Sequence, residues 1–193
     1  MHMFEYVIVL ISIVIGLALT HLMQGIAALI QNPRRTRIWW VHLVWAAYMF
    51  LSILFWWWWE FQLQTIKAWT FAIYLFVISY AFYLYLICAV LFPRNPEGYD
   101  SYKDYFLARR SWFFGLLIGW SVIDVVDTWV KGPDYFASHA QDTVIFNVIL
   151  ALTGIIRIAV RRPSVQAIIA VGQLAYVLTG LLRLFNLFSF ASS

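Results

Sequence analysis

The sequence predicts an all-α, polytopic membrane protein, with six transmembrane helices forming one domain over residues 1–193. Of its 193 residues, 64% are hydrophobic and only 11% are charged, whereas soluble domains are about half apolar and about a quarter charged. Such a chain cannot cover its apolar surface in water, so its solvent is lipid. Crossing about 30 Å of hydrocarbon takes roughly 20 apolar residues in a helix, and six stretches of the chain are long enough.

The first three predicted spans are separated by short polar breaks. The first span, residues 4–30, ends before Asn32-Pro33, because proline cannot continue a helix. The second span covers residues 38–61. A polar break at residues 62–67 then leads into the third span, residues 68–92.

The last three predicted spans follow the longest break, residues 93–110. The fourth span covers residues 111–130, and a glycine–proline turn leads on to the fifth, residues 142–160. Pro163 separates the fifth span from the sixth, residues 165–190.

The basic residues predict the orientation. Ten of the 13 Lys and Arg residues lie in or beside the first, third and fifth loops, and the other two loops hold only Lys67 and Lys131. Cytoplasmic loops carry the excess of basic residues, so both termini are expected outside (N-out, C-out), in a bacterial cytoplasmic (inner) membrane. The ten are Arg34, Arg35, Arg37, Arg94, Lys103, Arg109, Arg110, Arg157, Arg161 and Arg162.

Aromatic residues gather where the spans meet the membrane surface. The run Trp56–Trp59 closes the second span, and interfacial anchoring is favoured there over a ligand-stacking site. In the break 93–110, Tyr99, Tyr102, Tyr105 and Phe106 recur at helical spacing. We expect a short amphipathic helix lying on the membrane lipid, and docking of a protein partner on this loop is the alternative.

Ionisable groups at membrane depth are costly and mark functional candidates. An acidic outer layer is expected from Glu60, Asp124, Asp127 and Asn147, with Arg183 at similar depth. In a structural role, Arg183 pairs with Asp127 or Asp124, which makes spans four and six neighbours. In a functional role, close carboxylates resist double ionisation and hold a proton or a cation.

An inner polar layer is expected from His21, Gln24, His42, Arg157 and Gln173. His42 and Glu60 lie five helical turns apart and therefore share a face of the second span. Such faces turn towards protein or a water-filled cavity, although interhelical hydrogen bonds explain them equally. The polar faces of spans five and six comprise Asn147, Gly154, Arg157 and Arg161, and Gln166, Gln173, Tyr176, Gly180 and Arg183.

Motifs for enzymatic or cofactor chemistry are missing from the sequence. No catalytic, metal or cofactor site is expected, because His21 and His42 differ in depth by roughly 7 Å, a poor match for bis-histidine haem. An enzyme is not favoured, and a basic balance in a membrane protein does not indicate nucleic acid. Gly115 and Gly119 let helices approach closely and suggest a homo-oligomer.

These features favour passage of a small cation, a proton or a small polar solute across the membrane, as a transporter or channel does. The polar stripes and the acidic layer are the basis of that hypothesis. A non-transporting membrane subunit, sensor or scaffold of a larger complex is the alternative. A cofactor- or lipid-binding membrane protein is the third, suggested by the 20% aromatic content.

The orientation is testable by cysteine labelling in a Cys88→Ala background. Arg35→Cys and Asp100→Cys should resist impermeant thiol reagents in intact cells, because the basic loops are expected inside. Lys67→Cys and Ser138→Cys should label and serve as the matched accessible sites. Labelling of Arg35→Cys from outside contradicts the orientation.

Overall fold

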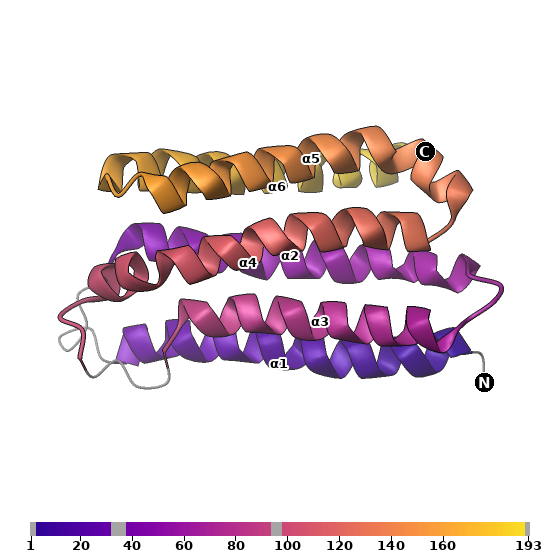
Figure 1. Ribbon diagram of the computed structural model, residues 1–193, viewed down its shortest axis with the longest axis horizontal. Coiled ribbons are helices and arrows are strands. Elements are labelled where there is room, and N and C mark those ends of the chain that lie inside the picture. The colour runs from indigo at the N-terminus through magenta and orange to yellow at the C-terminus, as the bar shows by residue number, and fades with distance from the viewer. Residues whose placement is uncertain (1–2, 32–37, 94–97, 192–193) are drawn as a thin grey trace.

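The computed structural model describes residues 3–31, 38–93 and 98–191, with side chains described as far as Arg183. This part of the chain forms six α-helices, and each is long and apolar enough to cross a membrane (Figure 1). The chain is therefore an integral, multi-pass membrane protein, as predicted. The elements are α1 (Met3–Gln31), α2 (Trp40–Trp59), the 3-10 helix η1 (Glu60–Thr65), α3 (Phe71–Leu91), α4 (Tyr102–Val130), α5 (Pro133–Ala159) and α6 (Pro163–Ala191).

The helices are arranged in three layers, with α1 beside α3, α2 and α4 in the middle, and α5 with α6 on the other side (Figure 1). Helix α2 is central, because it contacts α1, α3, α4 and α6. Helix α4 packs most extensively on α5, with which it forms a hairpin. Within the described residues α4 and α6 do not touch, so the prediction that spans four and six are neighbours is wrong.

The two ends of the bundle differ in charge. Helix α1 begins and α6 ends at the same end, where η1 and the α4–α5 turn also lie (Figure 1). We call it the acidic end, because Glu60 and Asp127 lie there, and the opposite end, with Arg109 and Arg161, the basic end. Arg34, Arg35, Arg37 and Arg94 lie outside the described residues, and the orientation in the membrane stays a prediction.

Two helices begin earlier than expected. The separate surface helix predicted within 93–110 is instead the start of α4, which begins at Tyr102, where the Ser101 hydroxyl accepts a hydrogen bond from the Asp104 amide at 3.1 Å. The aromatic face of these first turns is buried, since Tyr102 stacks on His42 at 5.2 Å between ring centroids. Helix α5 begins at Pro133 rather than residue 142, because proline suits the first helical turn.

The tryptophan run at the end of α2 divides between the core and the surface. Trp56 is buried and packs edge-on against Tyr80, with ring centroids 4.9 Å apart, so its predicted role as an interfacial anchor is wrong. Trp57 donates a hydrogen bond to the Ser12 hydroxyl at 3.2 Å, and Trp58 is exposed. The reason is geometric, since successive residues on a helix point about 100° apart.

The junction between α1 and the end of α3 depends on Gly25. A Cβ atom built there would overlap the base of the buried Phe92 ring, whereas one at Gly16 would meet open space on the same helix. Gly25 therefore allows α1 to approach the Phe92 side chain closely.

We expect Gly25→Ala to destabilise the protein by about 1–3 kcal/mol, because the added methyl group overpacks the Phe92 contact. Gly16→Ala is the matched control and should leave stability unchanged or slightly higher. Unfolding midpoints in detergent measure both effects. Equal midpoints for the two variants would mean that Phe92 can move aside freely.

Candidate functional site

A buried lysine organises the acidic end. The Lys131 side chain, in the turn between α4 and α5, is only 3% exposed. Its Nζ donates to Glu60 Oε1 at 2.9 Å and to Asp127 Oδ2 at 2.5 Å, and it lies 5.9 Å from the centre of the Tyr135 ring. One ammonium group therefore joins the end of α2 to the end of α4.

Local sequence explains how Lys131 reaches this position. Asp127 and Lys131 are four residues apart, which places them on the same side of a helix. Gly132 follows with a φ of 117°, a conformation that glycine adopts without strain, and it turns the chain straight into α5. Burial lowers the pKa of the Lys131 ammonium, but the Asp127 and Glu60 carboxylates outweigh burial and raise the pKa overall. The two carboxylates therefore favour the charged form of Lys131.

Asp124 lies one turn deeper and is held by neutral donors. Tyr80 of α3 donates to Asp124 Oδ1 at 2.9 Å, and Asn147 of α5 donates to Oδ2 at 2.7 Å. The Trp120 indole in turn donates to the Tyr80 hydroxyl at 2.6 Å. We call Glu60, Asp124, Asp127, Lys131, Tyr80 and Asn147 the acidic cluster.

The acidic cluster has an excess of acceptors and of carboxyl groups. It contains three carboxyl groups and one ammonium group, and Glu60 Oε2, Asp127 Oδ1 and Asn147 Oδ1 have no hydrogen-bond donor among the described residues. Neighbouring carboxylates resist simultaneous ionisation, so a proton or a small monovalent cation is the natural complement. A divalent ion suits the cluster less well, because its carboxylates do not converge on one point as in magnesium or calcium sites.

The predicted partner of these carboxylates, Arg183, is not part of the acidic cluster. Its side chain is exposed on α6, which does not contact α4 in the described structure. Asp127 pairs with Lys131, and Asp124 with Tyr80 and Asn147, so the Arg183 pairing is wrong. Matched membrane depth allowed the pairing, but depth does not show which helices are neighbours.

A second charged group, Arg157 of α5, is fully buried. Its guanidinium lies 4.2 Å from the Trp45 ring centre and 4.9 Å from that of Phe114. Nη2 donates to the Gln166 carbonyl at 2.7 Å, and the Gln166 side chain donates back to the carbonyls of Arg157 and Val160. No carboxylate pairs with Arg157 in the described parts of the chain, so aromatic faces and a carbonyl stabilise its charge.

The central helix carries a continuous buried polar face that ends at the acidic cluster. We call it the α2 polar face, and it extends into η1. Most of its polar atoms have no hydrogen-bond partner among the described residues: Trp45 Nε1, Tyr48 Oη, Ser52 Oγ, Trp56 Nε1 and Glu60 Oε2. The Tyr48 and Ser52 hydroxyls are neighbours one turn apart, without the geometry of a hydrogen bond, and Tyr48 is within electrostatic range of Arg157 and Asp124. Its members are His42, Trp45, Tyr48, Ser52, Trp56 and Glu60.

The two intramembrane histidines bind the end of α3. His42 Nε2 lies 2.7 Å from the Leu91 carbonyl, and His21 Nε2 lies 3.2 Å from that of Phe92. Each imidazole therefore forms a hydrogen bond through one ring nitrogen to a backbone carbonyl at the end of α3. The shared buried face of His42 and Glu60 is as predicted.

The other inner-layer candidates divide between the core and the surface. Gln173 is buried and donates to the Thr153 hydroxyl at 2.8 Å, so it links α6 to α5. Gln24 is exposed on α1 and does not join the expected polar layer. Tyr176 is also exposed, and hence the polar face predicted for α6 is buried only at its basic end.

Sequence reasoning missed four residues of these sites. Lys131 counts among the loop charges in the sequence, although its four-residue spacing from Asp127 is a pairing signal. Tyr48 and Ser52 lie on the predicted face between His42 and Glu60, so helical periodicity could have found them. Tyr80 carries no comparable signal, because only packing brings α3 beside Asp124.

Comparison with family models, with curated proteins and with solved structures finds no match to this chain. What the fold and the sites define is a class: an integral membrane protein of six helices with buried charges at two depths.

We expect Lys131→Met to destabilise the protein by about 3–5 kcal/mol, because it leaves Glu60 and Asp127 buried without their cation. The triple variant Lys131→Met, Glu60→Gln, Asp127→Asn should recover much of the loss, since no unpaired charge remains. Unfolding in detergent measures both, and Lys67→Met, at an exposed lysine, is the control. A Lys131→Met variant as stable as the control would mean that the carboxyl groups are already neutral.

Proposed function

We propose that this protein passes protons across the membrane, taking them up at the acidic cluster and relaying them along the α2 polar face. In the predicted orientation the acidic cluster is at the outer side. The observation that carries the proposal is the row of unpaired polar atoms along the central helix, from Glu60 to Trp45.

Unpaired buried polar atoms are costly, at about 1–3 kcal/mol each. A helix that serves only for packing is more stable with apolar residues at these positions. Bridging water would satisfy the atoms, because one water molecule can link two polar groups that make no direct hydrogen bond. Hydroxyl groups and water both donate and accept, so the Tyr48 and Ser52 hydroxyls with bridging water suit proton transfer. The Trp45 and Trp56 indoles only donate, so their part is to hold that water in place.

The acidic cluster provides an uptake site. Its excess of carboxyl groups attracts cations, and Glu60 belongs to both the cluster and the α2 polar face. A proton on the free Oε2 oxygen of Glu60 is therefore at the start of the row. Lys131 keeps the carboxyl groups in place and limits their negative charge.

Arg157 favours protons over metal cations. Its charge lies beside Trp45, and no carboxylate offsets it within the described residues. A metal ion must carry its whole charge and hydration past this point, whereas proton transfer needs only small movements of hydrogen-bonded groups. Arg157 also opposes an excess proton, so we expect the stretch beside it to limit the rate.

A second candidate, a proton-sensing subunit that does not conduct, is favoured by the packing around Arg157. The rings of Trp45, Phe113 and Phe114 contact one another at centroid distances of 5.2–5.4 Å. These rings and the guanidinium pack together in the core, towards the basic end of the bundle. In this case the acidic cluster binds a proton without passing it on.

The sharpest test removes a single hydroxyl. We expect Tyr48→Phe in liposomes to lower proton flux at least about tenfold, in line with loss of one proton-transfer group. Its unfolding midpoint should stay equal or rise, because an unpaired buried hydroxyl is removed. A pH-sensitive dye inside the vesicles, with a valinomycin-clamped potassium gradient, measures flux.

Tyr6→Phe is the matched control, because Tyr6 is exposed on α1, and its flux should equal that of the wild type. Glu60→Gln should also lower flux, by removing the uptake group. Wild-type vesicles with no flux above empty vesicles would reject passage and support the sensing subunit. Unchanged flux in Tyr48→Phe would reject the α2 polar face as the route.

A further inference from the structure

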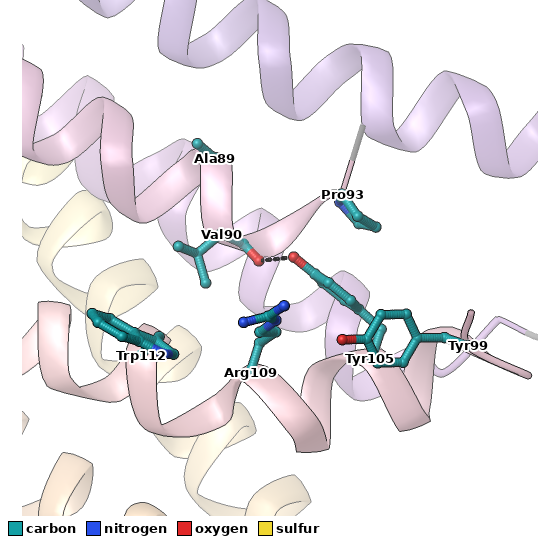
Figure 2. A pocket seen from close by; sticks show the side chains of 7 residues that line it. All are labelled: Ala89, Val90, Pro93, Tyr99, Tyr105, Arg109 and Trp112. Atoms are coloured by element: carbon teal, nitrogen blue, oxygen red, sulfur yellow. Dashed lines mark hydrogen bonds between the residues drawn. The ribbon is translucent and has the colours of Figure 1, made fainter. Parts of the chain in front are cut away.

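A pocket of about 370 Å³ opens at the basic end, between the last turn of α3 and the first turns of α4 (Figure 2). One wall is apolar backbone and side chain from Val90 and Pro93, and the other carries Tyr105, Arg109 and Trp112. The pocket belongs to neither the acidic cluster nor the α2 polar face.

The pocket is held in shape by Tyr105. Its hydroxyl donates to the Val90 carbonyl at 2.7 Å, which ties α4 to α3 across the pocket, and Figure 2 shows this bond. Tyr99 packs edge-on against the Tyr105 ring, with centroids 5.2 Å apart. The aromatic wall is therefore preorganised.

Arg109 supplies an available charge. Its side chain extends into the pocket between Val90 and Tyr105 (Figure 2), and it is exposed. No carboxylate pairs with it among the described residues. The nearby acids, Asp100 and Asp104, leave the guanidinium free, and Asp104 instead accepts a hydrogen bond from Ser101.

We propose that this pocket binds the phosphate group of an anionic phospholipid. A guanidinium offers phosphate two parallel charge-assisted hydrogen bonds. Basic pockets at the ends of transmembrane helices suit acidic lipid headgroups, and the amphipathic rings of Tyr105 and Trp112 suit the headgroup level. The proposal is independent of proton passage.

The surface beside the pocket fits the rest of the lipid. Phe82, Leu86 and Val90 succeed one another at four-residue spacing along α3, and therefore share one face. Phe82 and Leu86 are about half exposed. An acyl chain leaving a headgroup in the pocket can lie along this apolar face, which a free phosphate ion cannot use.

Native mass spectrometry of the purified protein tests the site, with phosphatidylglycerol and phosphatidylcholine as competing probes. We expect the wild type to retain one phosphatidylglycerol in preference to phosphatidylcholine. Arg109→Gln should weaken that binding about five- to tenfold, the effect of one basic group at a lipid headgroup. Arg109→Lys should retain part of the preference, because it keeps the charge without the planar fork.

Arg162→Gln is the matched control, because Arg162 is also exposed at the basic end but does not line the pocket. Equal losses in Arg109→Gln and Arg162→Gln would overturn the site and indicate general surface attraction. Equal retention of the two lipids by the wild type would also overturn it. Displacement of phosphatidylglycerol by millimolar inorganic phosphate would assign the pocket to a free anion and reject the lipid.

Discussion

The hydrocarbon of a membrane offers no hydrogen-bond partner, so a charged group inside it has to find one in the protein. Lys131 lies just beyond the α4 span but is sealed inside the protein, where the same requirement applies. Its buried ammonium reaches carboxylates on two elements and fixes the end of α2 against the α4–α5 turn. Asp124 lies beside α3 and α5, and it accepts hydrogen bonds from Tyr80 of α3 and Asn147 of α5. Four helices are thus positioned at the acidic end by the solvation of a few charges.

Arg157 meets the same constraint in another way. It rests on two aromatic rings and bonds a carbonyl that belongs to the next helix, so its solvation also closes the α5–α6 hairpin. Unpaired buried polar atoms also occur on Arg157, Gln166 and Asn147, but on the α2 polar face they follow one another along a single helix. Burying unpaired polar atoms along one helix costs stability. We explain that cost by the proposed passage of protons along the α2 polar face.

The two ends of the bundle handle charge differently because they meet different surroundings. At the acidic end the charges are sealed inside the protein, where their interactions are strong and little screened by salt. At the basic end Arg109 faces an open pocket, for which we propose a lipid phosphate as its partner. Tyr105 both ties α3 to α4 through its hydrogen bond to Val90 and lines that pocket.

Composition and hydropathy alone determined that the chain is a six-helix membrane protein, because helices spanning lipid must be long and apolar whatever their neighbours. Helical periodicity also placed His42 and Glu60 on one buried face. Position along the bundle was readable as well, since Asp124 and Asn147 come together as expected, but helix adjacency was not. A similar position along the helices made Arg183 a plausible partner of Asp127. In the structure α6 packs against α2 and α5, and Asp127 instead pairs with Lys131. Lateral order depends on how side chains of all six helices fit together, and only the tertiary structure decided it.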